Sequence, residues 1–420
     1  LEGARAQLTA LAELGVDLNA ITEQLQDDGV RAFTKSFEQL MDGIVEKRDM
    51  LLTDWQRFSD NLGEYQGLVD AVLEELSAEQ VIPRIWKYDH TVWKPDPEEI
   101  SNRLGWLRIA ERMLDDQPRF QSLVDSVRQD ERVYQHVLLL GMGGSSLAPE
   151  VFRKTFGVRD GYLDLAVLDS TDPGAVLAYE GELDLSRTLF VVSTKSGGTV
   201  ETLSFFKYFY NRVAESVGAE KAGDHFIAIT DQGSQLDQIA DRYHFRDKFL
   251  NDPNIGGRYS ALSYFGLVPA SLIGVDIQVL LERAMAMVCD NQGCDDPVKA
   301  DNYGARLGVI MGELAKAGRD KVTLITSPAI ASFGDWVEQL IAESTGKEGK
   351  GILPVVGEPV GVPEVYGDDR LIVYLRLDGD DTFDAAVQRL ESVGYPVVQI
   401  RLQDIYDLGG QVFLWEMATA

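Results

Sequence analysis

The spacing of hydrophobic positions along the chain changes near residue 137. Within residues 1–56, apolar side chains recur every three or four positions, as at Leu8, Leu11 and Leu14, and this spacing predicts helices. Further on, short apolar runs bounded by Gly, Ser, Thr or Asp alternate with helical stretches; they lie at 137–140, 165–168, 189–192 and 226–230. Apolar strands separated by helices are typical of a parallel sheet that is covered on both faces.

A second series of apolar runs follows a long helical stretch at residues 260–318, and its members lie at 321–326, 352–356, 371–375 and 397–400. We therefore predict an α/β fold of two tandem doubly wound parallel-sheet domains in αβα layers, with an N-terminal helical segment. The predicted divisions are 1–56, the helical segment; 57–130, a helical junction; 131–318, the first α/β domain with its helical connection; and 319–420, the second α/β domain, incomplete at its C-terminus.

Composition narrows the classes of partner. The formal charge of −29 makes nucleic acid and anionic membranes poor partners, because such a surface repels both. No apolar run approaches the roughly 20 residues that cross a bilayer, and residues 1–10 show no secretory pattern. Cys289 and Cys294 lack the spacing of a zinc site or a disulfide framework, so we expect plain thiols in a reducing cytoplasm. The starting Leu1 and the uncapped apolar pattern at 415–420 lead us to expect that both ends are cuts.

The first predicted strand of the sheet runs into a glycine-rich turn at residues 141–146 (Gly-Met-Gly-Gly-Ser-Ser). Gly143 and Gly144 let backbone N–H groups approach a ligand, and the next helix offers its positive N-terminal end. With the hydroxyl of Ser145 the turn suits a phosphate, although a tight turn without a ligand explains it equally well. The G-x-G-x-x-G spacing of a dinucleotide site fails at Ser146.

A second turn of this kind follows the third predicted strand, at residues 193–199 (Ser-Thr-Lys-Ser-Gly-Gly-Thr). The hydroxyls of Thr194, Ser196 and Thr199 flank two glycines, and Lys195 supplies positive charge in an acidic protein. A pair of Ser/Thr helix caps is the alternative, but a cap needs one hydroxyl rather than three with glycines. The carboxyl ends of parallel strands meet at one edge of a sheet, so we expect both turns to close on one phosphate group.

Two further segments carry candidate chemistry. Arg258 stands in Gly-Gly-Arg-Tyr-Ser at residues 256–260, where its guanidinium can stabilise a developing oxyanion; a surface ion pair is the alternative. In the helix predicted near 333–343, Gln339 and Glu343 are four residues apart and share one side. Glu343 is a candidate general base, and a solvated glutamate is the alternative.

At these residues the sequence resembles the glucose-6-phosphate isomerases. The two glycine-rich turns, Gly-Gly-Arg-Tyr-Ser and the Gln-x-x-x-Glu-Ser-x-Gly-Lys helix occur in the family's order, within about residues 85–420. Residues 1–50, with Ala-Glu-Leu-Gly-Val-Asp-Leu at 12–18, resemble the C-terminal helices of a transaldolase. The combination is similar to a fused transaldolase/glucose-6-phosphate isomerase, whose Schiff-base lysine would precede Leu1.

The resemblance implies two sugar-isomerase (SIS) domains with the site between them, usually in a homodimer, and neither metal nor nucleotide cofactor. It implies that Arg258 steadies an enediolate and that Glu343 moves the proton between C1 and C2. The substrate-binding residues it implies are Gly143, Gly144, Ser145, Thr194, Lys195, Ser196, Thr199 and Gln339.

The chain departs from the family at two points. The family's ring-opening histidine follows the catalytic glutamate, whereas no histidine follows Glu343. His90 is a candidate substitute, and a structural hydrogen bond is the alternative interpretation. The family's catalytic lysine would lie on a helix after Ala420, so we expect weak turnover from these residues alone.

The leading hypothesis is therefore an isomerase of glycolysis and gluconeogenesis that interconverts glucose 6-phosphate and fructose 6-phosphate by base-catalysed proton transfer through an enediolate. Two alternatives remain: a non-catalytic sugar-phosphate-binding SIS module, and a dual glucose/mannose-phosphate isomerase.

Overall fold

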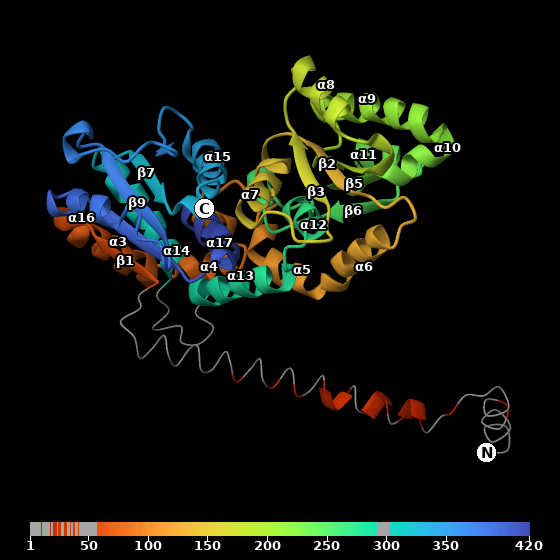
Figure 1. Cartoon of the computed structure of the whole chain (residues 1–420). Coiled ribbons are helices and arrows are strands. Elements are labelled where there is room, and N and C mark those ends of the chain that lie inside the picture. The colour runs from red at the N-terminus through yellow and green to blue at the C-terminus, as the bar shows by residue number, and fades with distance from the viewer. Residues whose placement is uncertain are drawn as a thin grey trace. The chain divides into compact units, whose positions relative to one another are not determined.

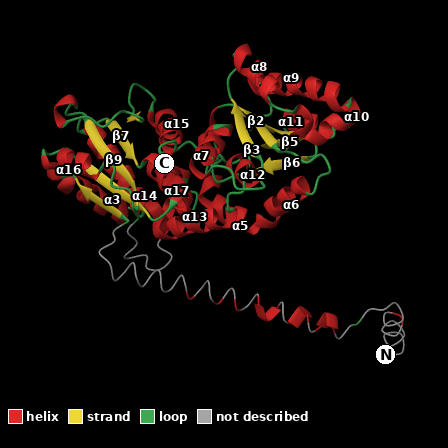
Figure 2. Ribbon diagram, in the orientation of Figure 1, coloured by secondary structure: helices red, strands yellow, loops and turns green. Residues whose placement is uncertain are grey.

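Runs of valine, leucine, isoleucine and phenylalanine form the strands of two sheets in the computed structural model (Figures 1 and 2). The structure describes residues 57–292 and 302–420, together with scattered positions between residues 10 and 41. In the first sheet the order is β3-β2-β4-β5-β6, and every neighbouring pair is parallel. These strands are β2 (His136–Gly141), β3 (Asp164–Leu168), β4 (Thr188–Ser193), β5 (Phe226–Asp231) and β6 (Asp247–Asn251).

Helices cover both faces of the first sheet because successive strand residues point to opposite sides. Leu138 and Leu140 of β2 join a cluster with the aromatic face of α9, whereas Val137 and Leu139 face a second cluster that includes α7 and α12. The helices of this part are α5 (Ile109–Asp115), α6 (Gln117–Arg128), α7 (Leu147–Phe156), α8 (Pro173–Glu182), α9 (Val200–Val217), α10 (Ala219–Ala222), α11 (Gln235–Arg242) and α12 (Tyr264–Leu272).

The second sheet has the order β1-β10-β9-β7-β8, in which β1 alone pairs antiparallel. Its strands are β1 (Phe58–Asn61), β7 (Lys321–Thr326), β8 (Leu353–Val355), β9 (Arg370–Leu377) and β10 (Val397–Leu402). The accompanying helices are α3 (Gln66–Ala78), α4 (Val81–Trp86), α13 (Ile277–Gln292), α14 (Tyr303–Lys316), α15 (Phe333–Thr345), α16 (Asp384–Ser392) and α17 (Leu408–Thr419). Every residue from Leu408 to Met417 of α17 is buried, so this helix runs through the core rather than along its surface.

The predicted α/β class with parallel sheets is confirmed, and each predicted apolar run forms a strand. Two strands were not predicted. β6 is short and largely polar, and β1 lies in the stretch 57–130 that was predicted as a helical junction. Asp60 of β1 accepts a hydrogen bond of 2.8 Å from Arg306 of α14, a partner that no local pattern can reveal.

The N-terminal part is a unit of its own, residues 1–57, and residues 58–420 form the other unit. The described positions between residues 20 and 41 are helical, as predicted. Most of the stretch that resembles a transaldolase, and Cys294, lie outside the described residues. None of the described helices is long and apolar enough to span a membrane. The boundaries proposed at 130/131 and 318/319 stay predictions.

Candidate active site

The two glycine-rich turns lie next to each other at the carboxyl edge of the first sheet. β2 and β4 are parallel neighbours that place Gly141 opposite Ser193. The Ser193 hydroxyl donates a hydrogen bond of 3.3 Å to the backbone carbonyl of Ser145, which ties the second turn to the first. Gly143 has a φ of +55°, a backbone conformation that favours glycine.

The second turn ends at the N-terminus of a long helix. Thr199 is the N-cap residue of α9, and its hydroxyl lies 2.8 Å from that of Thr194. Gly197, with a φ of +68°, packs so closely on α11 that a side chain there would meet the backbone nitrogen of Leu236. Backbone N–H groups and hydroxyls at a helix N-terminus form a site that suits an anion.

Lys195 lies in this turn but is already paired. Its ammonium forms an ion pair with Asp231 and donates a hydrogen bond of 3.0 Å to the carbonyl of Pro253. Burial raises the pKa of the Asp231 carboxyl, and the adjacent ammonium works in the opposite direction. The charge of Lys195 is therefore shared with a carboxylate, and its predicted contact with a phosphate stays a prediction.

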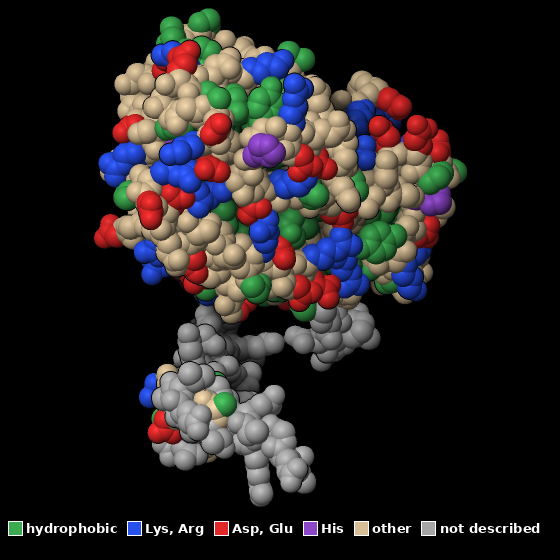
Figure 3. Space-filling model, turned by 90° about the vertical axis from the view of Figure 1, so that its right-hand side faces the viewer, with side chains coloured by type: hydrophobic (Ala, Val, Ile, Leu, Met, Phe, Trp, Pro, Cys, Tyr) green, Lys and Arg blue, Asp and Glu red, His purple; other side chains and the backbone are tan. Residues whose placement is uncertain are grey.

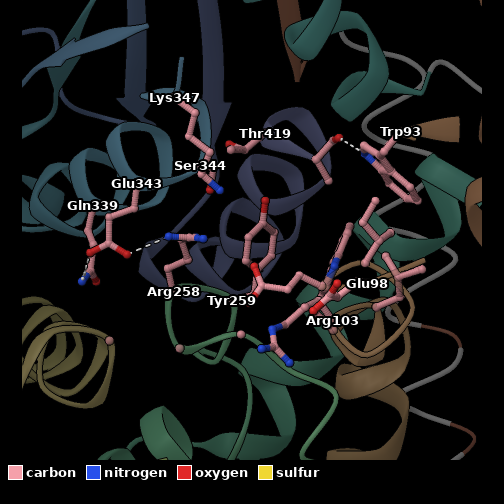
Figure 4. Close-up of a pocket in the computed structure, with 18 of the residues that line it drawn as sticks. Trp93, Glu98, Arg103, Arg258, Tyr259, Gln339, Glu343, Ser344, Lys347 and Thr419 are labelled. Carbon is pink, nitrogen blue, oxygen red and sulfur yellow. Dashed lines mark hydrogen bonds and ion pairs between the residues drawn. The ribbon is translucent and has the colours of Figure 1, made fainter. Parts of the chain in front are cut away.

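Arg258 and Glu343, which are far apart in sequence, form an ion pair with Nη1 and Oε2 2.8 Å apart (Figure 4). Gln339, one turn earlier on α15, donates a hydrogen bond of 3.0 Å to the other carboxylate oxygen of Glu343. The side chains of Arg258 and Glu343 are 29% and 51% exposed, and a pair this open contributes about 0–1 kcal/mol. The free-energy cost of displacing the Glu343 carboxylate from the Arg258 guanidinium with another anion is therefore small.

The turn that carries Arg258 packs directly on the first glycine-rich turn. A Cβ atom added to Gly144 would lie 2.4 Å from the backbone oxygen of Gly257. A Cβ atom added to Gly143 would lie 3.1 Å from the side-chain nitrogen of Gln339. These close contacts bring the first glycine-rich turn, the arginine turn and the Gln339–Glu343 face of α15 to one place.

A cavity of about 720 Å³ opens at this place. Of the predicted site residues, Gly144, Arg258, Gln339 and Glu343 line it. The remainder of its lining consists of Trp93, Lys94, Glu98, Glu99, Ile100, Arg103, Leu104, Trp106, Gly256, Gly257, Tyr259, Ser344, Lys347, Thr419 and Ala420.

The other predicted residues are not among those that line this cavity. They are Gly143, Ser145, Thr194, Lys195, Ser196 and Thr199, which form the two adjoining turns, and His90. His90 begins a short 3₁₀ turn, where its Nε2 atom lies 3.1 Å from the carbonyl of Pro95. All four histidines lie in the described part of the chain, and none of them lines the cavity. The structure thus offers His90 a structural hydrogen bond, and a role in ring opening stays a prediction.

The cavity also contains residues that the sequence patterns did not single out. Arg103 lies against the Gly256 turn, with its Cδ atom 3.8 Å from the place of a Cβ at Gly256, and it has no ion pair among the described residues. Tyr259 extends from the arginine turn toward Ser344 in Figure 4, and burial raises the pKa of its phenol. Lys347 follows Glu343 by four residues, a spacing that is visible in the sequence.

The charge of the lining differs from that of the whole chain. Lys94, Arg103, Arg258 and Lys347 balance the acidic side chains of the cavity, in a chain whose net charge is −29. On the face shown in Figure 3, the coloured part of the molecule has acidic and basic side chains interspersed rather than a continuous basic surface. The cavity is therefore a locally favourable place for an anion in an acidic protein.

The two sheets and this cavity define the class of protein: an α/β protein with two largely parallel sheets, of the sugar-isomerase (SIS) fold. The structure is similar to that of a glucose-6-phosphate isomerase from Chlamydia trachomatis, with a TM-score of 0.72 and 17% identity over 86% of this chain and 82% of that one. It is also similar to the hypothetical protein TT0462 from Thermus thermophilus, with a TM-score of 0.69 and 20% identity over 86% of this chain and 93% of that one.

Residues 113–350, more than half of the chain, match the phosphoglucose isomerase family. The chain belongs to this family.

Two relatives show what share of a glucose-6-phosphate isomerase is matched by this chain. The glucose-6-phosphate isomerase of Citrifermentans bemidjiense is 36% identical over 53% of this chain, which is 43% of the relative. That of Methanocaldococcus jannaschii is 29% identical over 68% of this chain and 77% of the relative. The match thus spans less than half of the first relative and about three quarters of the second.

Proposed function

We propose that the chain is an aldose–ketose isomerase that interconverts glucose 6-phosphate and fructose 6-phosphate. The observation that carries this proposal is the Arg258–Glu343 pair, which lies in a cavity beside the two glycine-rich turns. Membership of the phosphoglucose isomerase family and the names of the relatives support the same reaction.

In the proposed arrangement the phosphate lies in the two turns. Ser145, Thr194, Ser196 and Thr199 offer hydroxyl groups, and the N-terminal ends of α7 and α9 offer backbone N–H groups. Lys195 contacts the phosphate when it is released from Asp231, and Gly143 and Gly144 let backbone N–H groups approach the sugar phosphate. No metal or nucleotide takes part in this proposal.

In the proposed chemistry the Glu343 carboxylate takes the C2 proton of the open-chain aldose and returns it to C1. The electron pair of the broken C–H bond forms the C1–C2 double bond of an enediolate, whose negative charge develops on O1. A proton then passes from the C2 hydroxyl to O1, and the charge left on O2 becomes the C2 carbonyl of the ketose as C1 takes the proton from Glu343. Arg258 stabilises that charge, because a cation placed in advance costs no reorganisation during the step. Gln339 holds the carboxylate of Glu343 in place through its 3.0 Å hydrogen bond.

The test is the substitution Glu343→Gln, which keeps the shape of the side chain and removes the base. Exchange of the C2 proton of glucose 6-phosphate with deuterated solvent, measured by NMR, should fall by about 10²–10⁴-fold. Titration calorimetry should still detect saturable binding. The control Glu338→Gln changes an exposed glutamate of the same helix outside the cavity lining, and should exchange at the parent rate.

Two results would contradict the proposal in different ways. Exchange near the parent rate in Glu343→Gln would show that Glu343 is not the base. Saturable binding by the parent chain without any exchange would instead support a sugar-phosphate-binding module. Side-by-side rates on glucose 6-phosphate and mannose 6-phosphate would decide the specificity.

We further propose three properties of the protein beyond its reaction. The Ala-Glu-Leu-Gly-Val-Asp-Leu segment at 12–18 supports a fusion of this isomerase to a transaldolase. The resemblance to the family supports a homodimer, which sedimentation would test. A glycolytic reaction and the low cysteine content support a place in the cytoplasm.

A further inference from the structure

The proposed reaction makes a second demand on the cavity. Six-carbon aldose phosphates exist mainly as closed rings, and the C2 proton can be transferred only after the ring has opened. Opening breaks the bond between C1 and the ring oxygen O5, and O5 then requires a proton. A general acid close to Glu343 is therefore needed, because C1 and C2 are adjacent atoms.

The lining of the cavity contains few candidates for this acid. Arg103 and Arg258 keep their protons under all ordinary conditions and cannot donate one. Lys94 belongs to the stretch 93–106 of the lining rather than to the helix of Glu343. Burial raises the pKa of Tyr259, which makes its phenol a reluctant donor. Of the two lysines in the lining, Lys347 is the one that follows the helix carrying Glu343, and it is the candidate that we consider further.

The position of Lys347 is fixed by the end of α15. Glu343 lies in the last turn of this helix, Gly346 is its C-cap residue, and Lys347 follows directly. Lys347 and Glu343 both line the cavity, so the turn after α15 and the last turn of this helix present an ammonium and a carboxylate to the same space.

The turn after the helix is held by several hydrogen bonds. The backbone N–H of Lys347 donates to the carbonyl of Thr345 at 2.8 Å, and the N–H of Lys350 donates to the carbonyl of Lys347 at 3.0 Å. The hydroxyl of Thr345 accepts a hydrogen bond of 3.0 Å from the N–H of Ile352. The backbone of Lys347 is therefore positioned by the fold and does not depend on a ligand.

The side chain of Lys347 is available for a substrate. Figure 4 shows it extending into the pocket past Ser344, on the side of Arg258 and Tyr259. Among the described residues its ammonium has no ion-pair partner, whereas the ammonium of Lys195 and the guanidinium of Arg258 both have one.

We propose that Lys347 is the general acid that opens the sugar ring, an inference that rests on the proposed function. The C1–O5 bond breaks, its electron pair goes to O5, and O5 takes a proton from the Lys347 ammonium. The hydroxyl on C1 loses its proton to solvent water as its oxygen forms the carbonyl of the open aldose. Solvent then returns a proton to the Lys347 amine, so the balance of protons closes. The reverse sequence closes the ring of the product.

The experiment separates ring opening from proton transfer at carbon. An enzyme that opens and closes the ring accelerates exchange between the α and β anomers of glucose 6-phosphate, and this exchange breaks no C–H bond. Exchange NMR measures it on the same sample in which C2 deuterium incorporation is followed. Lys347→Arg keeps the positive charge but cannot donate a proton, and Lys347→Met removes both properties. Lys350→Arg and Lys350→Met are matched controls, since Lys350 is exposed and outside the lining.

We expect both Lys347 variants to slow anomer exchange by about 10²-fold or more, the usual range for loss of a general acid. Glu343→Gln should retain anomer exchange while losing C2 exchange, and the Lys350 variants should behave like the parent. Anomer exchange that is lost in the Lys347 variants and retained in Glu343→Gln would show that the two steps use different groups.

Several outcomes would overturn the inference. Parent-like anomer exchange in Lys347→Arg would exclude proton donation by Lys347. Loss of saturable binding in Lys347→Arg, detected by calorimetry, would make Lys347 a binding residue instead. C2 exchange by the parent without accelerated anomer exchange would leave the proposed function standing and refute this step. Absence of both exchanges in the parent would refute the proposed function itself, and the role of Lys347 with it.

Discussion

At the scale of single residues, the site depends on a cation and a carboxylate that restrain each other. The 2.8 Å pair between Arg258 and Glu343 orients both groups. Its exposure keeps the pair weak, so a substrate can separate the two groups and use each for a different purpose. The hydrogen bond from Gln339 keeps one carboxylate oxygen in place throughout.

Glycine at position 144 is required by packing rather than by backbone torsion. A Cβ atom there would meet the backbone oxygen and carbon of Gly257 at 2.4 and 2.6 Å, and backbone atoms cannot swing aside. Gly144→Ala should push the arginine turn away, lower the stability by about 1–3 kcal/mol and reduce kcat/KM more strongly than stability alone explains. Urea unfolding and isomerase kinetics measure the two effects.

Gly312→Ala is the control for this substitution, because a methyl group added there in helix α14 would meet no atom within 4 Å outside the backbone of its own helix. It should leave kcat/KM unchanged. Parent-like activity and stability of Gly144→Ala would show that the two turns are not packed as closely as the structure indicates.

At the scale of elements, helix α17 holds an ionisable side chain in the core. It is buried along almost its whole length, yet it contains Glu416, whose two carboxylate oxygens have no hydrogen-bond partner among the described residues. Burial raises the pKa of the Glu416 carboxyl well above its ordinary value of 4.5. The folded protein therefore holds this carboxyl in its neutral form at pH values where the unfolded chain ionises it.

The sign of the pH dependence follows from this difference. Above pH 4.5 the folded state binds one more proton at Glu416 than the unfolded state does, so stability falls as the pH rises, by about 1.4 kcal/mol per pH unit at most. In Glu416→Gln this contribution is absent. The unfolding free energy of the variant relative to the parent should therefore increase between pH 5 and pH 7, measured by urea titration at each pH.

An exposed carboxylate serves as the comparison. Glu338→Gln, on the surface of α15, should give a pH profile parallel to that of the parent. A Glu416→Gln profile that is also parallel to the parent would mean that Glu416 ionises equally in the folded and unfolded states.

At the scale of the whole molecule, the net negative charge of the chain opposes the binding of the anionic substrate that we propose. The chain carries a net charge of −29, while the cavity that we propose for an anionic sugar has a balanced lining. Segments that accompany each of the two sheets contribute basic side chains to one cavity, and these side chains offset the negative charge locally. Arg258 follows β6 of the first sheet, and Lys347 follows α15 beside the second sheet.

The net charge also predicts a response to salt. Raising the ionic strength from about 10 mM to 150 mM shortens the Debye length from about 30 to 8 Å and weakens the repulsion among like charges. The melting temperature should rise, by about 1–2 °C for each kcal/mol of repulsion that is screened in a chain of this length. Calorimetry in sodium chloride and in choline chloride should give the same rise. A fall with added salt would show that specific ion pairs outweigh the net repulsion.

The local pattern of apolar, glycine and polar residues determined most strands of this protein and the turns that follow them. The apolar runs specify the parallel strands because a strand buried on both faces must be apolar throughout, and β7 begins and ends at the predicted residues 321–326. The glycine-rich turns followed from their places after such strands, and Gln339 and Glu343 followed from helical spacing.

Tertiary structure alone decided the rest, because the partners are distant in sequence. β1 depends on distant partners, because it pairs with β10 and its Asp60 accepts a hydrogen bond from Arg306. The Arg258–Glu343 pair joins residues that are 85 positions apart. The pairing of Lys195 with Asp231, and the placing of Arg103, Tyr259 and Lys347 around one cavity, likewise depend on how the two sheets pack. Spacing along a chain records which residues share a strand or helix face, whereas the contacts between those faces are fixed only when the core closes.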